Sequence, residues 1–291
     1  MKYRVRHMTR YKYSKGVDLS SHLLHLRPRP LPHQIVRETC LLPSPAPLRL
    51  NEGHDHFGNR ITWLFLETRH ESFTVTAESL VDVLFPQAPL AEDTPPWEQV
   101  AYEAKTGGPN AQAAEFLFES PMCATDAGAG AYVAQSFPAG RPVMEGAIEV
   151  LDRMAKDFRF RSGVTTLATP IAKVLATREG VCQDFSHLMI SGLRSVGIPA
   201  RYVSGYIRTR PPPGQLRRRG SDQSHAWVSV WLGSEHGWLD LDPTNRLVVK
   251  DEHVVLGWGR DFGDVSPMRG VILGGGAHSL EVTVDLEPVE D

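Results

Sequence analysis

Apolar and polar residues alternate along the first 85 residues, and this period of two predicts short β-strands. The alternation occurs at Tyr3 to Val5, at 23–26, at 61–66 and at 73–83. Turn-forming segments separate these runs, among them the proline-rich stretch at 27–32. We therefore predict an all-β, sandwich-like N-terminal domain over residues 1–85.

The alternation stops after residue 85, and proline, alanine and glycine become frequent up to residue 143. Prolines punctuate this segment and flank possible helices at 97–105 and 110–119. We expect residues 86–143 to form a helical connector that packs on the surface.

Helical spacing of apolar residues begins at Met144 and continues through Ala147 and Leu151, which predicts a helix over 144–157. Thr169 and Pro170 suit the start of a second helix, since a hydroxyl can cap and proline fits the first turn. A third helix is expected to begin at or near Cys182 and to stop at Gly197. Its apolar face would consist of Phe185, Leu188, Met189, Leu193 and Val196.

Strand-like runs follow the third helix, at 200–207, 225–232 and 237–242. Helices followed by consecutive strands are typical of an antiparallel sheet with helices packed against it. We therefore predict an α+β fold, in which residues 144–291, including the C-terminal strands, form the second domain.

The composition limits the classes of function that fit. The chain has 291 residues, 41% of them hydrophobic, which suffices for two domains with real cores. A formal net charge of -3 gives no basic field for nucleic acid, and no apolar run approaches the roughly 20 residues of a membrane span. The basic N-terminus lacks the apolar stretch of a secretory signal, so we expect a cytoplasmic protein.

The three cysteines, Cys40, Cys123 and Cys182, are far apart, so neither a disulfide framework nor a cysteine-built zinc site is expected. Lone cysteines are more often buried apolar residues than reactive ones, and Cys40 and Cys123 fit that description. Cys182 differs because it follows Gly180 at a predicted helix start, where unpaired N–H groups stabilise a thiolate. Its own N–H could also bind an oxyanion.

A cysteine nucleophile needs a histidine base and a third group that orients the histidine. His225 begins the strand HAWVSVWL, whereas His187 lies about 140° around the helix from Cys182 and is expected to pack in the core. Asp240 and Asp242 share one face of the next strand, and carboxylates in an apolar strand are costly unless paired. We favour Asp242 at the strand end, although strand parity leaves Asp240 open.

Other polar residues offer weaker candidates. Asp184 is expected to cap the helix of Cys182, and Trp227 to belong to the core or to line a cleft. The tripeptide 54–56, His-Asp-His, lacks further ligands at metal-site spacing, and the glycines at 274–276 precede a strand, so we expect neither metal nor cofactor. The loop arginines are more consistent with a solvated loop than with an acidic-substrate site: Arg208, Arg210, Arg217, Arg218 and Arg219.

Three linked segments, GVCQDFSHLMISGLRSVGIPARYVSGYI, SHAWVSVWL and GWLDLDPTN, closely resemble the transglutaminase-like superfamily, a papain-related group with Cys, His and Asp in that order. The resemblance implies Cys182 as nucleophile, His225 as general base and Asp242 as the third member. The segments beginning KYRVRHMTRYKYS, with SSHLLHLRPRP and FGNRITWLFLE, resemble the β-rich N-terminal region of bacterial transglutaminase-like proteins. The likeness covers most of the chain except roughly 86–140.

The resemblance implies a papain-like or transglutaminase-like core and an enzyme that forms a thioester on Cys182 from a peptide or protein amide. Water would then complete hydrolysis, which we favour, or an amine would complete transamidation, as in a protein-glutamine gamma-glutamyltransferase. Two alternatives remain: a non-catalytic binding module with the same fold, and a structural protein in which Cys182 is buried.

Overall fold

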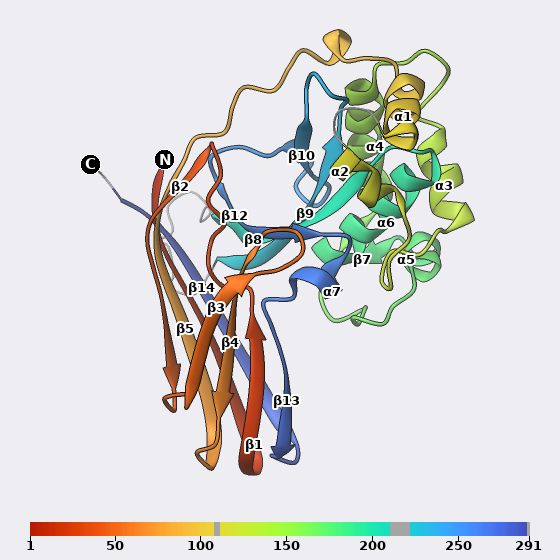
Figure 1. The fold of residues 1–291 in the computed structure, drawn as a ribbon. Coiled ribbons are helices and arrows are strands. Elements are labelled where there is room, and N and C mark those ends of the chain that lie inside the picture. Colours follow the sequence, from red (N-terminus) through yellow and green to blue (C-terminus); the bar gives the residue numbers. More distant parts are fainter. Residues whose placement is uncertain (108–110, 210–221, 290–291) are drawn as a thin grey trace, which may run out of the picture.

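The computed structural model describes residues 1–107, 111–209 and 222–289. The fold is α+β, as predicted. Figure 1 shows a curled antiparallel sheet, a second and smaller sheet beside it, and a group of helices on the far side of the smaller sheet.

The curled sheet is built on one long strand, β1 (Lys2–Leu24). The first half of β1 pairs with β5 (His70–Val83) and β14 (His278–Pro288), and the second half pairs with β4 (Arg60–Leu66) and β13 (Met268–Gly274). The pairing register of β1 with β5 and with β13 shifts near Val17, and such an irregularity bends the strand. The two halves of the sheet therefore face each other, which accounts for the sandwich-like arrangement.

Two further strands extend this sheet, β2 (Gln34–Ser44) beside β5 and β3 (Arg49–His54) beside β4. Alternate side chains of these strands meet inside the curl because successive residues of a strand point to opposite faces. The core so formed contains Tyr13, Val17, Leu24, Leu26, Leu41, Leu64, Leu66, Phe73, Val75 and Ala77.

The C-terminal strands β13 and β14 belong to this curled sheet, whereas the sequence placed residues 268–288 with the second domain. Val284 and Leu286 of β14 are buried with Tyr3 and Val5 of β1. The difference has a simple cause: periodicity identifies a strand, but it carries no information about which strand will pair with it.

The smaller sheet has five antiparallel strands in the order β11-β10-β9-β8-β12. The three predicted strands are confirmed as β8, β9 and β10, within two residues at each end. The bounds are β8 (Ala200–Ile207), β9 (Gln223–Trp231), β10 (Trp238–Asp242), β11 (Leu247–Val248) and β12 (His253–Gly259).

The three predicted helices are present as α4 (Val143–Asp157), α5 (Ile171–Thr177) and α6 (Cys182–Ser195). The predicted hydroxyl cap of α5 is absent, because Thr169 instead accepts a hydrogen bond from the backbone N–H of Thr166. Among the residues described, no helix combines the length and apolar character needed to cross a bilayer.

The segment 86–143 contributes to the core of the helical layer as well as connecting the two sheets. It contains α1 (Trp97–Thr106), α2 (Ala111–Ala114) and α3 (Ala127–Ala134), with 3-10 turns at Ala91–Asp93 and Glu115–Leu117. Helix α3 packs so closely on α6 that a Cβ at Gly192 would meet Val133 Cγ2 at 2.2 Å. The predicted surface connector is therefore partly internal.

Three short elements complete the fold. Strands β6 (Arg159–Phe160) and β7 (Glu179–Gly180) form a small parallel pair just before α6. Helix α7 (Phe262–Val265) follows β12. Apolar side chains of α6 and of one face of β9 share a single core, and the opposite face of β9 lies toward the curled sheet. The start of α6 is thereby fixed against the smaller sheet.

Candidate active site

The N-terminus of α6 is held by Asp184 in its first turn. The Asp184 carboxylate accepts hydrogen bonds from the Val181 N–H and the Thr165 hydroxyl, both at 2.7 Å. A Cβ at Gly180 would lie 2.9 Å from two atoms of Asp184, so only glycine leaves room for this cap. The expected capping role of Asp184 is what the structure shows, and Cys182 is the first, partly exposed residue of the helix.

Cys182, His225 and Asp242 are brought together from α6, β9 and β10. The His225 Nε2 lies 2.7 Å from Asp242 Oδ2, and the Cys182 side chain is close enough to His225 to raise its pKa. The imidazole therefore lies between a carboxylate, to which it is hydrogen-bonded, and a neighbouring thiol.

Asp242 is fully buried, and donors surround its carboxylate. Its Oδ1 accepts from the backbone N–H groups of Thr244 and Asn245, at 2.9 and 3.1 Å. Its Oδ2 accepts from the Asn245 side chain at 2.7 Å and lies 3.2 Å from His253 Nε2, in addition to His225. Burial alone would raise the pKa of Asp242, but the hydrogen bonds from His225 and His253 outweigh it and lower the pKa below its ordinary range.

The pKa of His225 is raised, whereas that of Asp242 is lowered. Burial lowers the pKa of His225, while the hydrogen bonds to Asp242 and Cys182 and the charges of those groups raise it, to about 9 overall. The site therefore favours an imidazolium between the carboxylate and the sulfur.

The structure distinguishes the two aspartates that strand parity left open. Asp240 accepts the indole N–H of Trp227 at 2.9 Å, whereas Asp242 contacts His225. Trp227 is completely buried, so it belongs to the core and lines no open cleft.

Two polar residues at this site, Asn245 and His253, were missed from the sequence. Asn245 lies three residues after Asp242, and its side chain and N–H both bind that carboxylate, a local arrangement that a turn after Asp-Pro could have suggested. His253 begins β12, and its side chain reaches Asp242 across β9 and β8, which separate β12 from β10 in the sheet.

The remaining cysteines and His187 lie in different surroundings. His187 is buried, receives the Phe262 N–H at 3.2 Å and packs on Tyr202, as expected of a core residue. Burial raises the pKa of the Cys123 thiol, and Cys40 is exposed on β2.

One group of side chains could offer ligand atoms to a metal ion. Ligand atoms of His225, Asp242 and His253 lie within 4.8 Å of one another. A metal there would replace the hydrogen bonds that join these residues.

The tripeptide 54–56 is occupied by local contacts. Asp55 accepts hydrogen bonds from Phe57 and Asn59 within its turn, and its Oδ2 lies 3.3 Å from His25 Nε2. Of the loop arginines, Arg208 is described, whereas Arg210, Arg217, Arg218 and Arg219 lie outside the described residues.

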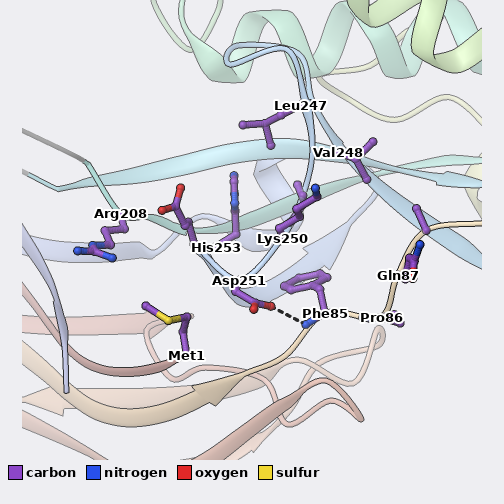
Figure 2. A pocket seen from close by; sticks show the side chains of 13 residues that line it. Met1, Phe85, Pro86, Gln87, Arg208, Leu247, Val248, Lys250, Asp251 and His253 are labelled. Carbon is purple, nitrogen blue, oxygen red and sulfur yellow. Dashed lines mark hydrogen bonds between the residues drawn. The ribbon is translucent and has the colours of Figure 1, made fainter. Parts of the chain in front are cut away.

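A cavity of about 910 Å³ is lined by His253 together with residues that adjoin both sheets, among them Met1 and Arg208 (Figure 2). The segment 85–88 lines it, and the Phe85 N–H donates to Asp251 at 2.8 Å. Cys182 and His225 are not among the residues that line this cavity. It therefore adjoins the site through His253 alone.

Comparison with known families agrees with this architecture. Residues 3–82 match the family model of the bacterial transglutaminase-like N-terminal region, and residues 131–243 match that of the transglutaminase-like superfamily. The chain belongs to the transglutaminase-like superfamily. The matched core includes Cys182, His225 and Asp242.

Several relatives are similar over different lengths. An uncharacterized protein of Mycobacterium tuberculosis is 40% identical over 99% of this chain and 93% of its own. A protein-glutamine gamma-glutamyltransferase of Pseudomonas aeruginosa is 42% identical over 24% of this chain and 11% of its own. The crystal structure of a candidate cysteine protease from Cytophaga hutchinsonii has a TM-score of 0.74 at 21% identity, covering 100% of this chain and 92% of that one, which shows the shared fold.

Proposed function

We propose that this transglutaminase-like protein is a cysteine-dependent amidase or peptidase whose nucleophile is Cys182. The observation that carries the proposal is the grouping of Cys182, His225 and Asp242, here called the triad, in which His225 is hydrogen-bonded to Asp242 and lies beside the thiol at the N-terminus of α6. A histidine held by a buried carboxylate beside a thiol at a helix start is the arrangement that activates a cysteine.

In the proposed reaction the Cys182 thiolate attacks the carbonyl carbon of an amide, and the N–H of Cys182 stabilises the tetrahedral oxyanion. The C–N bond then breaks, and the His225 imidazolium gives its proton to the departing amine. Water attacks the resulting thioester while His225 accepts one of its protons, and the C–S bond then breaks, which releases the acid and restores the thiolate and the imidazolium. Asp242 keeps the imidazole oriented throughout.

Transamidation is the second candidate, favoured by the local similarity to a protein-glutamine gamma-glutamyltransferase. The two outcomes share the thioester and differ only in whether water or an amine attacks it. Incubation with casein and a fluorescent primary amine separates them: hydrolysis predicts glutamine deamidation or peptide cleavage with little amine incorporated. A peptide or protein substrate and a cytoplasmic location are parts of the same proposal, and fractionation of the native host would test the location.

Alkylation by iodoacetamide at pH 7 tests the nucleophile directly. We expect mass spectrometry to find Cys182 modified faster than Cys40, an exposed thiol for which the described residues provide no hydrogen-bonded histidine, and Cys123 unmodified in its buried setting. The preference for Cys182 should disappear in a His225→Ala variant. Equal rates at Cys40 and Cys182 in the wild type would instead favour a non-catalytic binding module.

A further inference from the structure

Arg201 is a buried cation that makes no side-chain hydrogen bond to a carboxylate among the described residues. Only 9% of its surface is exposed, and the carboxylate of Asp240 acts on it through its charge. Its Nε is buried and has no hydrogen-bond partner in the described structure. The guanidinium instead lies over the rings of Trp238 and Trp258, with its carbon 4.2 and 3.7 Å from their centroids. Aromatic faces stabilise a guanidinium but leave its N–H donors unused.

The two nearest charges act on Arg201 in opposite directions, and the attraction to Asp240 is the larger effect. Arg29 also lies 3.7 Å over Trp258, so the two guanidinium groups occupy opposite faces of that ring. Burial lowers the pKa of Arg201 to about 9, Asp240 opposes this effect, and Arg29 adds to it. Arg201 thus remains a cation at neutral pH, and a buried cation is costly until an anion approaches it.

Arg201 lines a cavity of about 290 Å³ on the face of the smaller sheet that also carries Asp240. Across the strands, Arg201 of β8 and Asp240 of β10 both lie opposite Ser229 of β9. His33 also lines the cavity, and its Nε2 is buried without a hydrogen-bond partner among the described residues. Burial lowers the pKa of His33, so its neutral ring can donate or accept a hydrogen bond. The other walls are mostly apolar: Leu31, Phe85, Ala88, Leu232, Trp238, Val249, Val255 and Trp258.

We propose that this cavity binds a small organic carboxylate with an apolar or aromatic body. The guanidinium supplies paired donors whose geometry matches a carboxylate, and the apolar walls match the rest of such a ligand. Asp240, on the same cavity wall, disfavours the second charge of a phosphate dianion. The site is distinct from the triad: Ser229 lies four residues from His225 along β9, about 13 Å at the usual strand rise. It does not depend on the proposed function.

Isothermal titration calorimetry of the full chain with acetate, hexanoate and benzoate, each paired with its neutral amide, tests this proposal. We expect hexanoate or benzoate to bind at least about tenfold more tightly than its amide and than inorganic phosphate. Quenching of tryptophan fluorescence should accompany binding, because Trp238 and Trp258 line the cavity. Equal affinity for acid and amide throughout the set would rule out an anion-binding site at Arg201. Tighter binding of phosphate than of any carboxylate would rule out a carboxylate as the ligand.

Substitutions at the two charged residues should act in opposite directions. Arg201→Met should weaken carboxylate binding by about tenfold or more, because the charge and the paired donors are lost. Asp240→Asn should strengthen binding by about threefold, because a neighbouring negative charge is removed while an acceptor for Trp227 remains. Cys182→Ser should leave binding unchanged.

The variant Asp240→Asn keeps the proposal testable if Arg201→Met fails to fold. Unchanged or weaker carboxylate binding in folded Asp240→Asn would contradict an Arg201-centred anion site. Loss of binding in Cys182→Ser would place the carboxylate at the triad and would also overturn the proposal.

Discussion

Asp240 and Asp242 lie two residues apart on β10, point to the same face and carry the same functional group, yet their surroundings differ. Asp242 is fully buried and receives donors on both oxygens, whereas Asp240 receives the indole of Trp227. Period-two alternation identifies both residues as candidates but cannot tell which histidine or indole lies across the sheet. The strand end and the motif resemblance both favour Asp242, and its contact with His225 is a property of the folded sheet.

Replacing Asp242 with asparagine should reduce turnover of an amide substrate by about 10²- to 10⁴-fold, because the amide cannot stabilise the imidazolium and can select the wrong tautomer. The matched control is Asp240→Asn, two residues away on the same face, which should change turnover less than about threefold. Steady-state kinetics would compare the two. A comparable loss in both variants would mean that sheet disruption, rather than loss of the orienting carboxylate, is responsible.

The protonation of His225 should make stability depend on pH. Its pKa is raised from 6.5 to about 9 in the folded protein, so the native state holds this proton more tightly than the unfolded chain. The resulting stabilisation is fully present below pH 6.5 and is lost as the pH rises through about 9. Urea unfolding between these pH values should show a falling free energy of unfolding, and His225→Gln should flatten that slope. An identical slope in both proteins would show that other groups titrate.

At the scale of elements, the entry into α6 determines where the thiol lies. Gly180→Ala should force Asp184 away from the helix N-terminus, because the new Cβ would lie 2.9 Å from two of its atoms. Loss of such a cap costs about 1–2 kcal/mol. We expect a lower melting temperature and slower alkylation of Cys182. Thr165→Val, which removes one donor to Asp184 but leaves the Val181 contact, should have a smaller effect on both measurements.

The helices and strands that build the site were the most predictable elements. Helix α4 and helix α6 have apolar residues at helical spacing, and the structure confirms both within a residue or two. The same reasoning treated 86–143 as a surface connector, because prolines and small residues dominate it. Small residues are what let α3 approach α6 at Gly192, so a composition that suggests a linker also permits close helix packing.

At the scale of the whole molecule, the C-terminus completes the sheet that the N-terminus begins. Val5 pairs with Leu286 across 281 positions of sequence, and local patterns contain no information about such a pairing. The contact between His253 and Asp242 spans only 11 positions, but it depends on the order of strands in the smaller sheet, where β9 and β8 separate β10 from β12. Buried residues of β1, β5 and β14 share a cluster with Tyr206, Val254 and Leu256 of the smaller sheet. The two sheets therefore depend on one another.

Leu286→Ala should destabilise both sheets together by about 2–5 kcal/mol, because Leu286 is completely buried in that shared cluster. Leu280→Ala is the matched control on the same strand: its side chain is 54% exposed, so the change should stay within about 0.5 kcal/mol. Circular dichroism and the exposure of Cys123, buried in the helical core, should report one coincident transition that shifts in Leu286→Ala. If Cys123 stayed protected while the circular dichroism changed, the curled sheet would unfold independently.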